Sequence, residues 1–125
     1  PGHSFWASPL GAAVARGVPA MYRGAGAVEM VRAQAPRLAA AFERLSAIPG
    51  VRRVRTMGLV GAAEVGGGGY GGEVGWRVFE AALARGVFLR PLGDVVYVTP
   101  ALNARDADLA FLLDALDERG RWVMR

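Results

Sequence analysis

Cysteine and lysine are both absent from this sequence of 125 residues, and histidine occurs once, as His3. Without cysteine, the chain has neither a disulfide framework nor a thiolate-bound zinc site. Without lysine, it has no side-chain amine that could form a Schiff base with a carbonyl compound. A single histidine near the start gives no spacing from which a Ser-His-Asp triad could be argued. The residues therefore predict no catalytic residue and no metal site within this chain.

Long apolar runs and a secretory leader are missing as well. No stretch approaches the roughly 18 uncharged apolar residues of a membrane-spanning helix. The start, Pro1-Gly2-His3-Ser4, contains no initiator methionine, basic segment or apolar core of a signal peptide. We therefore expect a cytoplasmic chain without a membrane partner, cut from something longer. Apolar residues make up 53% of the chain, which excludes a disordered tail and allows one domain with a real core.

All 15 basic residues are arginine, and the net charge is +4. Arginine favours phosphate and nucleic-acid contacts, but it is also frequent in chains rich in alanine, glycine and valine. Only Arg52, Arg53 and Arg55 form a tight cluster; acidic residues separate most of the others. A nucleic-acid-binding surface needs a stripe of positive charge. Because the arginines are scattered, the arginine content is better explained by the overall composition of the chain than by nucleic-acid binding. A small basic α+β module that contacts nucleic acid or an acidic partner through this cluster remains the alternative function.

Helices are predicted in the first half of the chain by caps and apolar spacing. Ser8 and Pro9 form an N-cap and a first helical position, and the helix that follows is expected to be interrupted at Gly17 and Pro19. Residues 27–47 carry an apolar stripe at spacings of three and four, with a kink or restart expected at Pro36.

The second half of the chain shows two more helical patterns. The helix expected over residues 73–85 has an apolar stripe formed by Trp76, Phe79, Ala82 and Leu83. Asn103 is expected to cap the last helix, with an inner face formed by Leu109, Leu112, Leu113 and Leu116.

Two extended segments are expected within residues 51–65 and two more within residues 86–100. Glu64 lies in a nearly apolar segment, and the two interpretations of it are a strand-end residue and a partner of one of the arginines. The order of helix, two strands, helix, two strands and helix predicts an α+β domain with a small, mainly antiparallel sheet covered by helices.

Residues 66–72 are glycine except for Tyr70. A functional interpretation is a phosphate cradle, and the ordinary one is a flexible surface connection. Neither a GxGxxG pattern nor a P-loop lysine accompanies the glycines, so the sequence favours the surface connection.

Residues 86–100, GVFLRPLGDVVYVTP, hold Arg90 between an apolar run and a Pro-Leu-Gly-Asp turn. An arginine at the end of a strand beside a tight turn has little freedom, which suits two-pronged recognition of a carboxylate. By spacing alone, a hairpin with an arginine that faces water is the more ordinary interpretation.

Four segments together carry a more specific pattern: residues 2–13 (GHSFWASPLGAA), 55–65 (RTMGLVGAAEV), 70–82 (YGGEVGWRVFEAA) and 86–100. They resemble the C-terminal portion of class III (subgroup II) aminotransferases, which use pyridoxal 5′-phosphate. The resemblance covers nearly the whole chain, and residues 86–100 are its most specific part. It is strongest toward members that act in biotin synthesis.

The resemblance implies a fold like the C-terminal small domain of fold-type I aminotransferases. Residues 1–26 would continue from a missing large domain, and residues 27–125 would form the small domain. Arg90 would bind the carboxylate of the amino donor or keto substrate, and the backbone of Gly2 would lie against the substrate. The hydroxyl of Ser4 would reach the cofactor phosphate of the neighbouring subunit in a homodimer.

The family's large domain carries the Schiff-base lysine and most ligands of the cofactor phosphate. The resemblance therefore implies that this chain alone does not catalyse transamination. A third hypothesis is an interaction domain without its own ligand, which would self-associate through exposed apolar stripes.

Overall fold

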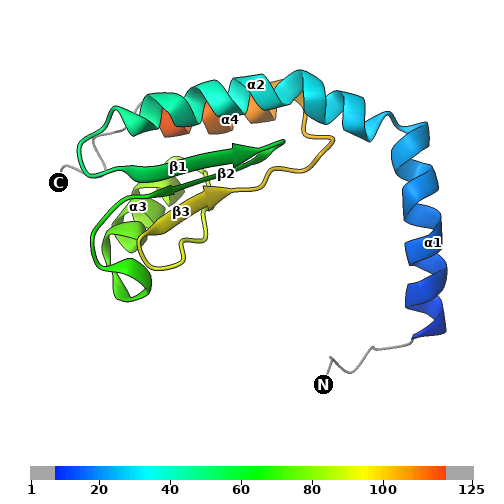
Figure 1. Ribbon diagram of the computed structural model, residues 1–125, viewed down its shortest axis with the longest axis horizontal. Helices are drawn as coiled ribbons and strands as arrows, with labels where there is room; N and C mark the ends of the chain where they lie inside the picture. Colours follow the sequence, from blue (N-terminus) through cyan, green and yellow to red (C-terminus); the bar gives the residue numbers. More distant parts are fainter. Residues whose placement is uncertain (1–7, 118–125) are drawn as a thin grey trace.

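The computed structural model describes residues 8–117, and it confirms an α+β fold with a small antiparallel sheet (Figure 1). Three strands lie in the order β1-β2-β3, and helices cover them. Along the chain the elements are α1 (Pro9–Gly24), α2 (Ala27–Ser46), β1 (Arg52–Met57), β2 (Val60–Glu64), the 3-10 turn η1 (Gly69–Gly71), α3 (Val74–Leu83), β3 (Val95–Val98) and α4 (Asp106–Asp117).

Helix α1 begins as the sequence predicts, with the Ser8 side chain accepting a hydrogen bond from the N–H of Gly11 at 3.3 Å. The predicted interruptions at Gly17 and Pro19 are wrong, because the helix continues to Gly24. A proline removes one intrahelical hydrogen bond, but its fixed φ is helical, so the flanking turns keep the helix. No residue of α1 is buried, and Figure 1 shows it standing away from the sheet.

Helix α2 lies across the sheet and brings Leu38, Ala41 and Phe42 into the core. It is a single helix that contains Pro36, so of the kink or restart expected there, the restart does not occur. The Phe42 ring lies directly against Gly61 of β2, where any added Cβ would overlap it. The absence of a side chain at Gly61 therefore allows α2 to approach this strand closely.

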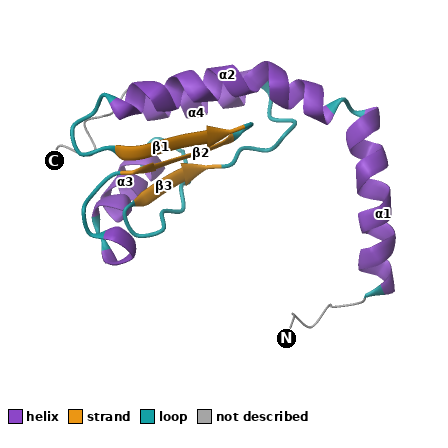
Figure 2. Ribbon diagram, in the orientation of Figure 1, coloured by secondary structure: helices purple, strands orange, loops and turns teal. Residues whose placement is uncertain are grey.

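The sheet has one strand fewer than predicted (Figure 2). Both pairs are antiparallel, with Met57 opposite Val60 in the first and Gly61 opposite Val98 in the second. Residues 87–91 do not form a strand, and only an isolated bridge joins Leu92 to Val95. Pro91 has no N–H to give to a strand ladder, which helps to explain why pairing stops at the turn.

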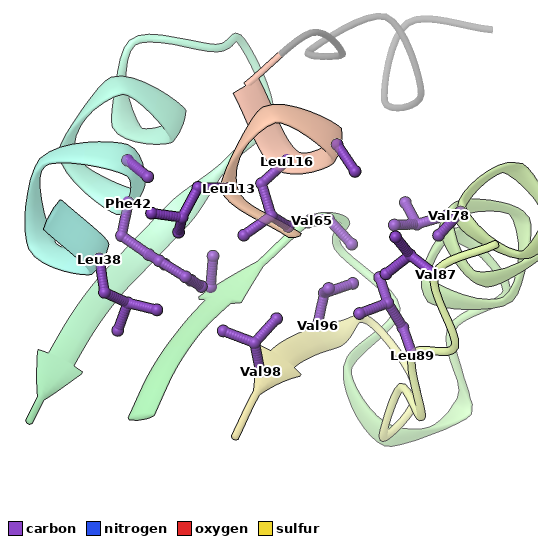
Figure 3. Close-up of a cluster of buried hydrophobic side chains, with 14 of the residues drawn as sticks. Leu38, Phe42, Val65, Val78, Val87, Leu89, Val96, Val98, Leu113 and Leu116 are labelled. Carbon is purple, nitrogen blue, oxygen red and sulfur yellow. The ribbon is translucent and has the colours of Figure 1, made fainter. Parts of the chain in front are cut away.

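The core lies between the sheet and helices α2 and α4, with α3 and residues 87–89 closing one side (Figure 3). The predicted inner face of α4 is confirmed, with Leu109, Leu113 and Leu116 buried and Leu112 partly buried. Helix α4 starts at Asp106, so Asn103 is not its cap. Arg105 instead pairs with Asp108 in the first turn, at 2.7 Å and 2.8 Å.

The predicted stripe of α3 is only partly right, because Ala82 is buried while Trp76 is 58% exposed. The buried face consists of Gly75, Val78 and Ala82. A neighbouring stripe, shifted by one position, therefore faces the core, and apolar spacing alone does not distinguish the two. Among residues 8–117, no helix is long and apolar enough to cross a membrane.

Candidate functional site

Arg90 lies on the extended segment that leads from α3 to β3, with its side chain exposed. The preceding residue, Leu89, is buried in the core. Within residues 8–117 the Arg90 guanidinium forms no hydrogen bond or ion pair. Its donors are therefore available to an anion.

A shallow hollow of about 260 Å³ lies beside Arg90. The Arg90 guanidinium is the one charged group among its lining residues, and Tyr97 and Thr99 contribute hydroxyl groups. Apolar and aromatic side chains form the rest, so the hollow suits a ligand with a carboxylate and an apolar portion. The lining residues are Phe88, Leu89, Arg90, Tyr97, Val98, Thr99, Pro100 and Leu112.

The turn after Arg90 is closed as the sequence predicts. Leu92 and Val95 exchange backbone hydrogen bonds of 2.9 Å and 3.0 Å. Gly93 has a φ of 56°, a left-handed conformation that glycine adopts easily. Arg90 is thus attached to a tight turn on one side and to a buried leucine on the other.

Asp94, at the end of this turn, is a residue whose role the sequence analysis missed. It is only 2% exposed, although it is charged. Its carboxylate accepts hydrogen bonds from the N–H groups of Gly68 at 2.7 Å, Val74 at 3.0 Å and Gly75 at 3.4 Å. No local signal in the sequence points to this role, because Asp94 follows Gly93 as an ordinary turn residue and its partners lie 19 to 26 residues away.

The glycine-rich loop, residues 66–72, is wrapped around this aspartate. Residues 67–71 are exposed, as expected for a surface connection. The loop is nevertheless anchored, because Gly68 donates to the Asp94 carboxylate and the Gly69 carbonyl accepts from the Asp94 N–H at 2.9 Å. An added Cβ at Gly66 or Gly72 would overlap the carboxylate. The space of a phosphate cradle is therefore filled by the chain's own acid.

Two arginines of the cluster, Arg52 and Arg53, line a second hollow of about 540 Å³, together with part of the glycine-rich loop and Asp94. Arg52 donates to the carbonyl of Gly66 at 2.6 Å, and Arg53 pairs with Glu64 at 3.2 Å. Arg55 donates to the backbone carbonyl of Arg53 at 2.9 Å. Glu64 is thus both a strand-end residue and an arginine partner. All three arginines of the cluster have partners in the fold, which weakens the hypothesis of a nucleic-acid surface.

The other predicted site residues, Gly2 and Ser4, lie outside the described residues, as does His3. Of the predicted substrate and cofactor ligands, the structure therefore places Arg90. Within residues 8–117 no group of acidic and histidine side chains could hold a metal ion.

Comparison with known proteins gives a consistent result. Residues 1–119 match the family described as aminotransferase class III. The chain is 37% identical over 125 residues to the adenosylmethionine-8-amino-7-oxononanoate aminotransferase of Synechococcus elongatus, covering 94% of this chain and 28% of that protein. The corresponding protein of Geobacter sulfurreducens is 31% identical over 124 residues, covering 94% of this chain and 27% of that protein.

Solved structures show the same fold. The adenosylmethionine-8-amino-7-oxononanoate aminotransferase of Methanocaldococcus jannaschii superposes with a TM-score of 0.78 at 24% identity, over 94% of this chain and 28% of that structure. The chain thus spans little more than a quarter of the length of these relatives. Together, the family match and the relatives over 30% identical establish that this chain belongs to the class III aminotransferases.

Proposed function

We propose that this chain is the C-terminal domain of an aminotransferase that moves an amino group to a keto substrate in biotin synthesis. The curated relatives named above, which are adenosylmethionine-8-amino-7-oxononanoate aminotransferases, support this assignment. Residues 1–26 continue from a larger domain, and residues 27–125 form the small domain. The exposed apolar side chains of α1, among them Leu10 and Met21, agree with contacts to a further part of the enzyme.

Arg90 is the substrate-carboxylate residue in this proposal. The observation that carries it is a guanidinium without a protein partner among the described residues, held beside an apolar hollow by a closed turn. A planar guanidinium binds a carboxylate through two parallel hydrogen bonds. The apolar wall would contact the remainder of the substrate and exclude water from this pair.

The family depends on pyridoxal 5′-phosphate, and a related aminotransferase from Vibrio fluvialis is described as bound to it. Bound in the whole enzyme, the cofactor supplies the electron sink for amino transfer. The residues described here do not fit a complete cofactor site. The sequence has no lysine for a Schiff base, and the Gly68 amide is occupied by Asp94. We therefore assign most cofactor contacts to the rest of a cytoplasmic homodimer, with Ser4 on the phosphate and Gly2 beside the substrate.

The coding sequence upstream of Pro1 gives the first test. We expect it to encode a large domain whose Schiff-base lysine follows a strand, a few tens of residues before Pro1. A reading frame without such a lysine, and without a co-encoded chain that carries one, would contradict the proposed enzyme.

The second test is the Arg90→Ala substitution in that enzyme. Loss of a charged, two-pronged hydrogen bond is worth about 1.5–3 kcal/mol, so we expect the KM of the carboxylate substrate to rise roughly 10- to 100-fold. Arg32→Ala, at an exposed arginine of α2, is the matched control and should leave KM unchanged. An unchanged KM in the Arg90 variant would show that Arg90 does not bind the carboxylate.

A further inference from the structure

Asp94 is the buried charged residue among residues 8–117, and no ion pair between these residues reaches its carboxylate. Its carboxylate is instead satisfied by three backbone N–H groups, from Gly68, Val74 and Gly75. Two of these belong to the first turn of α3, where the helix dipole also favours a negative charge. A buried carboxylate with this many charge-assisted bonds has a defined position, because losing any of them leaves polar groups unpaired.

The Asp94 backbone also forms hydrogen bonds, to the glycine-rich loop and to the end of β2. Its N–H donates to the carbonyl of Gly69 at 2.9 Å, and its carbonyl accepts from the N–H of Val65 at 2.8 Å. One residue therefore joins the end of β2, the glycine-rich loop, the start of α3 and the turn of residues 91–94.

Glycines make this junction possible. A Cβ added at Gly75 would overlap the carbonyl of Gly93, and one added at Gly93 would overlap the carbonyl of Gly69. The backbone of the turn thus lies directly on the backbone of α3 and of the loop. These contacts hold the turn in one position relative to α3 and the loop, because backbone atoms cannot move aside as a flexible side chain can.

Arg90 is fixed between this junction and the core. Leu89 holds it on one side with a side chain that is 4% exposed, and Pro91 begins the turn on the other with a restricted φ. The closed Leu92–Val95 pair transmits the position of Asp94 to Pro91 over a few residues. The direction in which Arg90 leaves the backbone therefore depends on how the Asp94 carboxylate is held.

We propose that Asp94 is a positioning residue for Arg90, which acts by locking the turn of residues 91–94 onto the glycine-rich loop and the start of α3. The inference rests on the proposed function of Arg90 as the carboxylate-binding residue. Asp94 itself does not touch the substrate. Its effect is confined to substrates that use the Arg90 contact.

The test compares two amino donors in the enzyme expressed with the coding sequence upstream of Pro1: an amino acid and a primary amine without a carboxylate. Asp94→Asn keeps the size of the side chain but removes its charge and turns an amide N–H₂ toward N–H donors. We expect KM for the amino acid to rise about 10-fold, while KM for the amine and both kcat values change less than about 2-fold. Asp114→Asn, at an exposed acid of α4, is the control and should leave KM unchanged for both amino donors.

The double variant separates positioning from general stability. In an Arg90→Ala background, Asp94→Asn should produce no further rise in KM for the amino acid, because the contact that it positions is gone. An equal loss for both donors, or an added loss in the double variant, would make Asp94 a structural residue only. If Asp94→Asn gives no folded enzyme, Asp94→Glu retains the charge and displaces it by one methylene. That variant should lower the ratio of KM for the amine to KM for the amino acid by a few-fold. An unchanged ratio would overturn the inference.

The two proposals fail in different ways. If Arg90→Ala leaves the preference for the amino acid intact, the proposed function of Arg90 is wrong. If Arg90→Ala abolishes the preference but neither Asp94 variant changes it, the function stands and the positioning role of Asp94 is wrong.

Discussion

Two hollows on the described part of this domain are lined by arginine, and they differ in whether that arginine has a partner within residues 8–117. Three arginines are clustered near the hollow of about 540 Å³, and each donates to a group of the fold. A single arginine borders the hollow of about 260 Å³, and no described residue partners it. The density of positive charge along the sequence therefore does not show which guanidinium is left without a partner in the fold.

The register of the hairpin explains why the cluster is satisfied. Arg52 lies opposite Glu64 in the β1–β2 pair, and the pairing is irregular between Arg52 and Arg55. Arg53, within this irregularity, has a φ of 46°, so its backbone is left-handed. This bulge lets its side chain reach Glu64 on the neighbouring strand. Around Arg90, by contrast, the backbone is locked and the side chain is left free.

The rigidity of the Arg90 side can be tested by a pair of glycine substitutions, for which we expect the largest effect. Gly75→Ala places a Cβ against the carbonyl of Gly93, and we expect destabilisation of at least about 2 kcal/mol despite the better helix propensity of alanine. Gly67→Ala, in the wall of the other hollow, meets no atom within 4 Å and should change stability by less than about 0.5 kcal/mol. Urea unfolding followed by circular dichroism measures both. Equal effects would mean that the two sides do not differ in packing.

The availability of the arginines can be tested by activity. The double substitution Arg52→Ala with Arg53→Ala should leave the KM of the carboxylate substrate within about 2-fold, against the roughly 10- to 100-fold rise expected for Arg90→Ala. Steady-state kinetics of the enzyme with its upstream portion provides the measurement. A comparable rise in the double variant would remove the contrast between the hollows.

Nucleic-acid binding gives an independent test of the cluster. Because Arg52, Arg53 and Arg55 are bonded within the fold, we expect no mobility shift with single-stranded or duplex nucleic acid, even at low salt. A salt-dependent shift that disappears in the Arg52→Ala, Arg53→Ala variant would favour the basic binding module instead.

The smallest expected effect concerns the bulge at Arg53. Its ion pair with Glu64 is mostly exposed on the arginine side, at 78%, so losing it costs less than about 1 kcal/mol. Arg53→Gly and Arg53→Ala both remove that pair, but only glycine fits a φ of 46° without strain. We therefore expect the glycine variant to be more stable than the alanine variant by about 1 kcal/mol in urea unfolding. The reverse order would show that the left-handed backbone at Arg53 is not retained.

Much of the fold could be predicted from local patterns. Caps and apolar periodicity located α1, α2 and α4, and the Pro-Leu-Gly-Asp sequence located the turn after Arg90. The failures have more than one cause. The interruptions expected at Gly17 and Pro19 are absent although α1 has no buried residue, whereas the buried face of α3 depends on tertiary contacts. Trp76 fits a helical stripe as well as Val78 does, and only the position of the sheet selects which of them is buried.

The position of Arg90 beside a closed turn could be predicted from the sequence for the same reason, whereas its role as a carboxylate ligand stays a prediction. Arg90 could be singled out because its neighbours in sequence form the turn that holds it. The bonds of Asp94 reach Gly68 and Val74, which are 26 and 20 residues away, and no local pattern indicates such partners. The glycine-rich loop was therefore interpreted without the acid that gives it shape.

The junction at Asp94 also has a consequence for how this domain can change over generations. The carboxylate occupies the space that side chains at Gly66 and Gly72 would need, so acid and glycines form one inherited unit. A lineage that loses the acid is released from the requirement for glycine at both positions. A lineage that gains a side chain at either one must first lose the acid. A side chain at Gly66 or Gly72 should therefore appear only in descendants that have also lost the acid.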